Sequence, residues 1–173
     1  MFMKRVILIR HGKQEHGKDE GLSQLGKQQA TRTGLYLAEK YRDTGIAGLI
    51  TSDLKRAKET ADGISHEFGD IPVTTNPALR ERMNWGDGDP DEPFEDFSRL
   101  WNATLHDREL KSPGRESSIE SGERLDRSLQ SLPEDERPYI IVGHGGIFAE
   151  LLRNHFPNDE IAQHMPHFPD IGQ

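Results

Sequence analysis

The sequence of 173 residues contains no cysteine. That absence excludes disulfide frameworks, thiolate zinc sites and cysteine nucleophiles, and it gives no sign of an oxidising compartment. Long apolar runs are missing as well, because the run near the start holds only residues 6–9 before Arg10 interrupts it. Such a run is too short for the apolar region of a signal peptide or for a membrane span. We therefore expect a cytoplasmic protein with no membrane partner.

Basic residues are in the minority. The chain has 30 acidic residues against 22 lysines and arginines, and its formal net charge is -8. Binding to a nucleic-acid backbone requires a basic surface, so this balance argues against a nucleic-acid partner. An acidic chain can still hold a phosphate group where its few arginines and histidines meet in one pocket. The positions of those residues therefore decide which ligands the chain can bind.

Apolar periodicity predicts strands that alternate with helices. A continuous apolar run of the kind found in buried parallel strands lies at residues 6–9, and further strands are expected at residues 47–51, 71–74 and 139–142. Apolar residues at helical spacing predict helices within residues 23–41, 57–68, 94–105, 125–132 and 148–156. Right-handed strand–helix–strand crossovers make such a sheet parallel, with helices on its faces. The fold class we expect is α/β, a three-layer α/β/α sandwich with a mostly parallel central sheet.

The length is that of one domain, so we expect a single domain over residues 1–173. Its pattern changes at about residues 80–120, where an acidic, proline-bearing stretch precedes the helix expected at 94–105. We interpret this region as an inserted, lid-like segment with a solvated acidic face. The aromatic stripe of Phe94, Phe97 and Trp101 is interpreted as packing within the lid, with a lining of the substrate entrance as the alternative. Residues 158–173 receive no assignment.

Chemically useful side chains follow the expected strands. In an open parallel sheet, ligands bind beyond the carboxyl ends of the strands. Arginine binds phosphoryl oxygens through a planar fork that keeps its charge, and glycines beside a histidine let the backbone approach an anion. The residues that follow the four strands are Arg10 and His11, then Ser52 and Arg56, then Arg80, Glu81 and Arg82, and finally His144.

Five sequence blocks carry a family resemblance. They are Arg10-His11-Gly12, residues 22–30, residues 51–61, Leu79-Arg80-Glu81-Arg82 and Val142-Gly143-His144-Gly145-Gly146. In this order they resemble the histidine phosphatase superfamily, branch one, also called phosphoglycerate-mutase-like. The resemblance implies that His11 is the nucleophile of a phosphohistidine intermediate. It further implies that Arg10, Arg56 and His144 bind the phosphoryl oxygens, that Glu81 donates the proton, and that no metal or cofactor takes part.

The residues themselves agree with these roles. A neutral imidazole nitrogen can attack phosphorus, and nearby arginines disfavour protonation of His11. The same positive groups stabilise the charge of in-line phosphoryl transfer. Glu81 needs a raised pKa to act as an acid, whereas Arg80 or Arg82 would favour its ionised form if either pointed inward. Ser23 and Ser52 are candidates for further hydroxyl contacts to the phosphate.

The chain departs from the family pattern in places. Gly17 stands where many relatives carry an asparagine that reaches the phosphate, and Lys13 or Gln14 is the candidate to compensate. The usual Gly-Glu-Ser block is altered to Ser121-Gly122-Glu123-Arg124. His164 and His167 leave a zinc site open as a minor alternative.

Three functions remain open at this point. The first is a phosphomonoesterase that acts on a phosphorylated small molecule or on a phosphoprotein, because the insert is modest and a mutase must keep water from its phosphoenzyme. The second is a phosphoglycerate-type mutase. The third is a catalytically weak phosphate-binding or interaction module, which the departures from the family pattern favour. The sequence makes no prediction of the oligomeric state.

Overall fold

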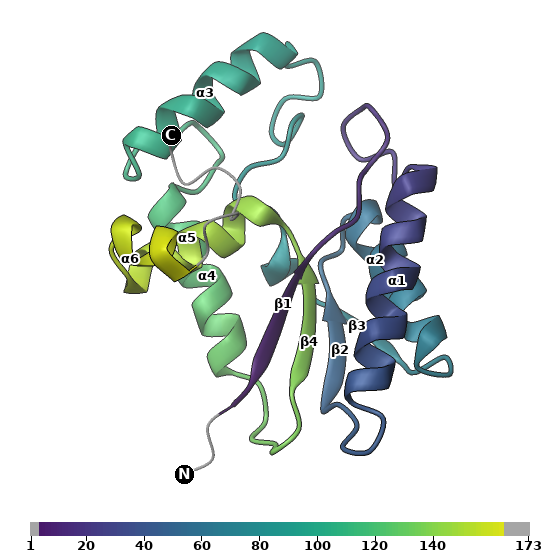
Figure 1. Cartoon of the computed structure of the whole chain (residues 1–173). Helices are drawn as coiled ribbons and strands as arrows, with labels where there is room; N and C mark the ends of the chain where they lie inside the picture. The colour runs from purple at the N-terminus through teal and green to yellow at the C-terminus, as the bar shows by residue number, and fades with distance from the viewer. Residues whose placement is uncertain (1–3, 165–173) are drawn as a thin grey trace. The chain divides into compact units, whose positions relative to one another are not determined.

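The computed structural model describes residues 4–164, in which four parallel strands form one sheet (Figure 1). The sheet consists of β1 (Val6–Arg10), β2 (Gly48–Thr51), β3 (Val73–Thr75) and β4 (Tyr139–Gly143). The order in the sheet is β1-β4-β2-β3, so β4, the last of the four in the sequence, lies between β1 and β2. Arg10 pairs with Gly143 and Thr51 pairs with Val142. The carboxyl ends of these three strands therefore meet at one edge.

The described residues divide into two units. The first runs up to Arg80 and resumes over Leu132–His144, and it contains the whole sheet. The second comprises Glu81–Ser131 and the residues that follow from Gly145. The insert expected at about 80–120 thus belongs, from Glu81 onward, to the same unit as the helices that follow β4. The interpretation of the chain as a single domain with an inserted lid stays a prediction.

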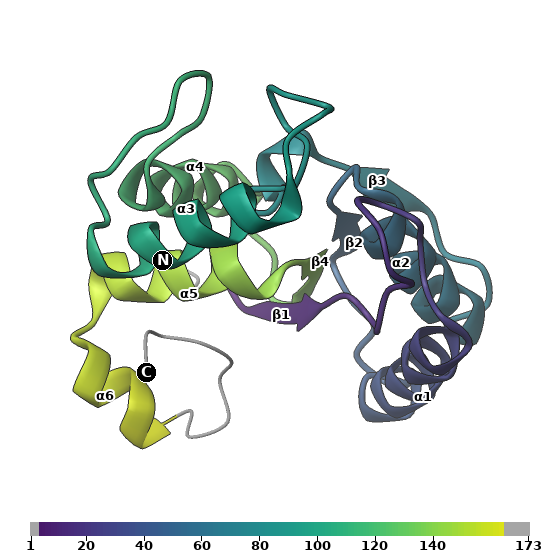
Figure 2. The same ribbon diagram turned by 90° about the horizontal axis from the view of Figure 1, so that it is seen from above.

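Two helices of the first unit, α1 (Gln24–Lys40) and α2 (Lys55–Glu67), run beside one another (Figure 2). Glycines permit their close approach, since a β-carbon on Gly63 would lie 2.9 Å from that of Ala30. Between α2 and the sheet lies an apolar core, where burial of each aliphatic side chain contributes roughly 1.5 to 3 kcal/mol. That core consists of Leu37, Leu49, Ala57, Ala61, Ile64, Ile140 and Val142. A short 3-10 helix, η1 (Pro77–Leu79), follows β3.

The second unit is helical. It contains α3 (Phe94–His106), α4 (Ser118–Gln130), α5 (Gly145–His155) and α6 (Asn158–His164). A reciprocal capping box fixes the start of α4, where the Ser117 hydroxyl accepts from the Glu120 N–H and the Glu120 carboxylate accepts from the Ser117 N–H. Gly122 of α4 lies directly against the Glu150 carbonyl of α5, which leaves no room for a side chain.

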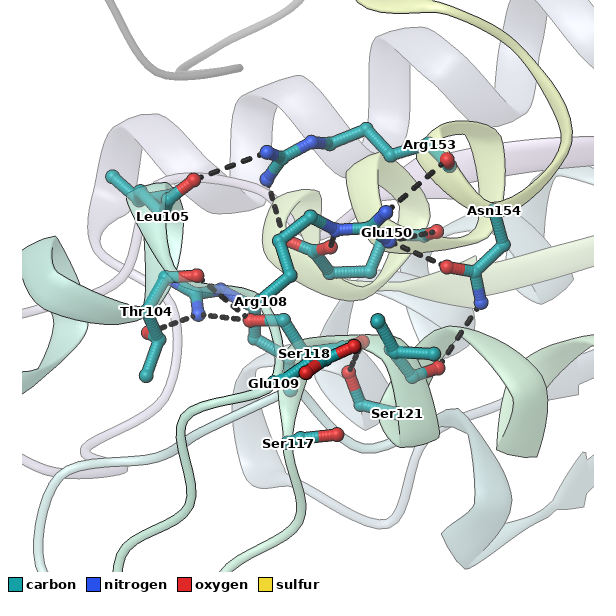
Figure 3. A network of polar contacts seen from close by, with 12 residues as sticks. Thr104, Leu105, Arg108, Glu109, Ser117, Ser118, Ser121, Glu150, Arg153 and Asn154 are labelled. Atoms are coloured by element: carbon teal, nitrogen blue, oxygen red, sulfur yellow. Dashed lines mark hydrogen bonds and ion pairs between the residues drawn. The ribbon is translucent and has the colours of Figure 1, made fainter.

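A buried charge network ties the segment after α3 to α5 (Figure 3). The Glu150 carboxylate is 1% exposed and accepts from Arg108 at 2.7 Å and from Arg153 at 3.1 Å. Arg108 also donates to the Asn154 side chain, and Arg153 donates to the Leu105 carbonyl at 3.0 Å. Two guanidinium groups are thus held by one carboxylate and by neighbouring oxygen atoms.

The expected elements are confirmed. The α/β class and the parallel sheet are present, and each expected strand and helix appears with its ends moved by a few residues, except that the helix expected from residue 125 begins at Ser118. Sequence periodicity gave no assignment to residues 158–173, whereas the structure places α6 over Asn158–His164. His167, and with it the alternative zinc pair, lies outside the described residues. No helix among residues 4–164 has the length and apolar character that a membrane crossing requires.

Candidate active site

His11 leaves the end of β1 and contributes its ring to the carboxyl edge of the sheet. Its backbone N–H donates to the Gly143 carbonyl at 2.9 Å, which extends the pairing of β1 with β4. The ring Nδ1 lies 2.7 Å from the Gly12 carbonyl oxygen. A carbonyl only accepts, so Nδ1 carries the proton and Nε2 carries the lone pair. The Arg56 Nε–H donates to that Nε2 at 3.2 Å.

The surroundings keep the His11 ring neutral. The pKa of His11 is lowered from 6.5 to about 4, because burial and the positive charges of Arg56 and Arg10 together outweigh the hydrogen bond to Gly12 and the charge of Asp19. At pH 7 the imidazole therefore has an unprotonated nitrogen. This is the form that can attack an electrophile.

Arg56 lies in the first turn of α2 and is 5% exposed. Its guanidinium pairs with the Asp19 carboxylate at 3.2 Å, and Asp19 also accepts from the Lys55 N–H at 2.8 Å at the start of the helix. Asp19 thus caps α2 and holds the arginine that contacts His11. Sequence reasoning missed Asp19, because it lies in an irregular loop far in the chain from its partners.

His144 directly follows β4 and is fully buried. Its ring centroid lies 5.2 Å from that of His11, at an interplanar angle of 58°. The His144 Nε2 lies 2.9 Å from the Ser52 hydroxyl, which itself accepts from the Leu54 N–H at 3.3 Å. Ser52 therefore orients the second histidine. Its direct contact to a phosphate stays a prediction.

The backbone behind His11 is fixed by α2 and α1. The Gly12 N–H donates to the buried Thr60 hydroxyl at 3.0 Å, and that hydroxyl donates to the Arg56 carbonyl at 2.7 Å. A β-carbon on Gly12 would lie 2.5 Å from the Gly26 carbonyl oxygen, so the first turn of α1 requires glycine here. Gly26 and Thr60 lie within two of the five sequence blocks, 22–30 and 51–61, but the sequence predicts no contact for either.

The loop between His11 and α1 carries the other predicted contacts. The Ser23 hydroxyl caps α1, since it accepts from the Gly26 N–H at 3.2 Å and donates to the Lys13 carbonyl at 2.9 Å. Both hydrogen bonds of the Ser23 hydroxyl serve the cap, so its contact with a phosphate stays a prediction. Gly17 adopts a positive φ of 132°, a turn conformation that suits glycine better than asparagine. Compensation by Lys13 or Gln14 also stays a prediction.

Glu81 belongs to the second unit, where its carboxylate faces the start of α5. Its oxygens accept from the N–H groups of Gly146 at 3.1 Å, Ile147 at 2.7 Å and Arg82 at 2.8 Å. Burial raises the pKa of Glu81, although these three hydrogen bonds and the charge of Arg82 act in the opposite direction. The carboxyl group consequently keeps its proton to a higher pH than an exposed glutamate.

The two arginines beside Glu81 differ in their surroundings. Arg80 is exposed and pairs with Asp53 at 2.7 Å. Arg82 is 5% exposed and donates to the hydroxyls of Thr104 at 2.7 Å and Ser118 at 3.1 Å. Its guanidinium carbon lies 3.7 Å from the centre of the Trp101 ring. Arg82 is thus a buried member of the second unit, which the sequence left undecided.

The ends of the strands therefore define an α/β protein in which arginine and histidine side chains gather at the carboxyl edge of the sheet, with Arg56 and His144 buried. The same fold occurs in solved structures. A mycobacterial glucosyl-3-phosphoglycerate phosphatase solved with VO3 matches with a TM-score of 0.62 and 28% identity, over 86% of this chain and 80% of that one. A phosphoserine phosphatase from Entamoeba histolytica also has a TM-score of 0.62, at 24% identity over 88% of this chain and 79% of that one, and shows the fold alone.

The family model of the histidine phosphatase superfamily, branch 1, matches residues 6–168. The chain belongs to this superfamily, so the resemblance seen in the five sequence blocks is confirmed. Two relatives are called probable phosphoglycerate mutase GpmB, from Erwinia tasmaniensis at 33% identity and from Proteus mirabilis at 32%. Each alignment spans 165 residues, 87% of this chain and 74% of the relative. Similar proteins thus carry the names of both phosphatases and mutases.

Proposed function

We propose that this protein is a phosphomonoesterase that hydrolyses a phosphorylated small molecule or a phosphoprotein through a phosphohistidine on His11. The observation that carries the proposal is the state of the His11 ring. Its Nδ1 proton is engaged by Gly12, its pKa is lowered to about 4, and its Nε2 lone pair lies 3.2 Å from the Arg56 guanidinium. A neutral nitrogen nucleophile beside a permanent cation is what attack on a phosphate dianion requires.

In the first step, His11 Nε2 attacks phosphorus, so a P–N bond forms while the P–O bond to the leaving alcohol breaks. Arg56 turns from the lone pair to a phosphoryl oxygen as the bond forms, and Arg10 and His144 bind the remaining oxygens. The leaving oxygen takes the proton of Glu81, whose raised pKa supports this role. No group outside the chain is needed for this transfer.

In the second step, water attacks the phosphohistidine. The Glu81 carboxylate, now ionised, accepts a proton from that water, and the P–N bond breaks to release inorganic phosphate and the neutral imidazole. Atoms and charges balance over the cycle, with one water consumed for each ester hydrolysed. The phosphorylated substrate is the one partner that this proposal requires.

The test uses the turnover of p-nitrophenyl phosphate. We expect the intact chain to release phosphate and His11→Ala to lose about a thousandfold or more of that rate. The matched control is His66→Ala, because His66 is an exposed histidine of α2 whose side chain is 74% accessible. Acid-labile, base-stable labelling by substrate should appear in the intact chain and in the control. Full activity of His11→Ala would end the nucleophile assignment.

The relatives named phosphoglycerate mutase favour a mutase as the second candidate. A phosphoglycerate supplied with and without a bisphosphate primer separates the two reactions. Phosphate release that outpaces isomerisation supports the phosphatase, whereas primer-dependent isomerisation that outpaces release supports the mutase. An intact chain that binds phosphate but turns over neither substrate would be the interaction module instead.

A further inference from the structure

The loop of residues 13–22, which lies between β1 and α1, is attached to the first two turns of α2 (Figure 1). Asp19 of the loop accepts from the Lys55 N–H of α2 at 2.8 Å. Glu59 of α2 accepts in turn from the Leu22 N–H of the loop at 2.6 Å. The loop and the helix therefore each supply one carboxylate to a backbone N–H group of the other, and the loop is held at two points.

Gly21 brings the backbone of the loop close to the Glu59 carboxylate. This glycine is buried and has a φ of 93°, which a residue with a side chain rarely adopts. A β-carbon on Gly21 would lie 2.7 and 2.8 Å from the two carboxylate oxygens of Glu59. The Gly21 carbonyl also accepts from the Glu15 N–H at 3.0 Å, which closes the loop on itself. The Glu59 carboxylate therefore lies directly against the loop backbone, so a shift of one displaces the other.

The contact with Glu59 is connected to the nucleophile by a series of short contacts. Only two residues separate Leu22 from Asp19, so the hydrogen bond to Glu59 limits where the Asp19 carboxylate can lie. Asp19 pairs with the Arg56 guanidinium at 3.2 Å, and the Arg56 Nε–H donates to the His11 Nε2 at 3.2 Å. All of these residues belong to the first unit.

We propose that Glu59 is a positioning residue for phosphoryl transfer, which holds Asp19 at the start of α2 and so keeps Arg56 in place. Glu59 acts through the backbone of the loop and touches no reacting atom. This inference rests on the proposed function, because the attack by His11 is the step that requires the arginine. A residue that acts in this way must be long enough to reach the Leu22 N–H, whereas its charge is not required.

Two conservative substitutions separate the reach of Glu59 from its charge. Glu59→Gln keeps an oxygen acceptor at the same distance from the helix and loses the charge, whereas Glu59→Asp keeps the charge and is shorter by one methylene. We expect kcat/KM for p-nitrophenyl phosphate to stay within about twofold of the intact chain in the first and to fall about fivefold in the second. Full activity of Glu59→Asp, or a loss in Glu59→Gln alone, would overturn the proposal. Asp62→Asn is the matched control, because Asp62 is an exposed acid of the same helix.

A double-mutant cycle with Asp19→Asn shows whether Glu59 acts through Asp19. If it does, Glu59→Asp should cost less than about twofold in the Asp19→Asn background, because the ion pair that it positions is already absent. A residue that only stabilises the fold would reduce kcat/KM by the same factor in both backgrounds. Losses that multiply in the double variant would therefore refute the positioning role, even with both single variants impaired.

The titration of His11 tests the same contacts without turnover. The Asp19 charge raises the pKa of His11, so displacement of Asp19 in Glu59→Asp should move the midpoint measured by NMR below about pH 4. Glu59→Gln should leave the midpoint unchanged. A chain that releases no phosphate from any ester would refute the proposed function and would leave this result intact. Equal His11 midpoints in the intact chain and in Glu59→Asp would refute the role of Glu59, whatever the turnover.

Discussion

The Asp19 carboxylate lies 3.2 Å from the Arg56 guanidinium, which in turn donates to the Nε2 of His11. Asp19 also accepts from the Lys55 N–H at the start of α2. One carboxylate therefore performs two tasks, since it caps the helix that carries the arginine and it fixes the direction of the arginine side chain. Asp19 touches no reacting atom in the proposed mechanism, so it is a positioning residue.

Asp19→Asn separates these two tasks. Asparagine still accepts from the Lys55 N–H, so we expect the free energy of unfolding to change little, whereas Asp19→Ala should lose about 1 kcal/mol with the cap. Both variants lose the ion pair, so kcat/KM for a phosphomonoester should fall by about tenfold in each. Urea unfolding and steady-state kinetics measure the two effects. An Asp19→Asn variant with full activity would show that the pair does not position Arg56.

The lowered pKa of His11 gives a prediction that is independent of turnover. Protonation of the imidazole should occur near pH 4 rather than near 6.5, and NMR of ring-labelled histidine follows it in the free protein. In Asp19→Asn the midpoint should move to still lower pH, because the Asp19 charge raises the pKa of His11 and its removal lowers it. Titration of His11 at about 6.5 would contradict the buried, arginine-flanked ring.

The lowered pKa of His11 also makes the free energy of unfolding depend on pH. Between about pH 4 and 6.5 the unfolded chain binds the His11 proton and the folded chain does not, so the free energy of unfolding rises with pH in this window. For a half-buried ring we expect roughly 2 kcal/mol, present in full above pH 6.5 and lost as the pH falls toward 4. His11→Gln lacks this contribution, so the difference between the two unfolding curves measures it.

The sequence predicts most strands of the sheet and about half of the residues of the candidate site. Residues 6–9 and 139–142 predict strands through their unbroken apolar runs, and the polar residues after them mark the edge where His11 and His144 meet. The sequence did not reveal that β4 lies between β1 and β2, because strand order depends on pairing between distant segments. That order is what brings His144 within 5.2 Å of His11.

The supporting residues were harder to find. Asp19 and Thr60 act through hydrogen bonds to groups 36 and 48 positions away, and neither stands at a strand end or in a periodic pattern. For Ser23 the sequence predicted a phosphate contact, whereas the structure gives it a role as a helix cap, which is common for a serine before an amphipathic run. Sequence position predicts a capping residue more readily than it predicts a ligand contact.

Arg82 supplies a charge that opposes the raised pKa of Glu81. Arg82→Met removes that charge, so the pKa of Glu81 should rise further and the alkaline limb of the kcat profile should move to higher pH. Arg82→Lys retains the charge and should restore the limb. The Met variant also leaves the Thr104 and Ser118 hydroxyls without their donor, at a cost of about 1 to 3 kcal/mol in unfolding free energy. If Arg82→Met folds and the alkaline limb of its kcat profile stays at the same pH, Arg82 has a packing role alone and its charge does not affect Glu81.

The Glu150 network makes the last prediction, which concerns the second unit alone. Glu150→Gln leaves the partly buried Arg108 and Arg153 with no carboxylate between them, so the free energy of unfolding should fall by about 3 kcal/mol. Glu123→Gln is the matched control, because its pair with Arg127 on α4 is exposed and should contribute under about 1 kcal/mol. Both tryptophans of the chain belong to this unit, so urea unfolding followed by tryptophan fluorescence reports on it directly. Equal unfolding midpoints for the two variants would mean that the buried carboxylate holds the arginines no better than an amide does.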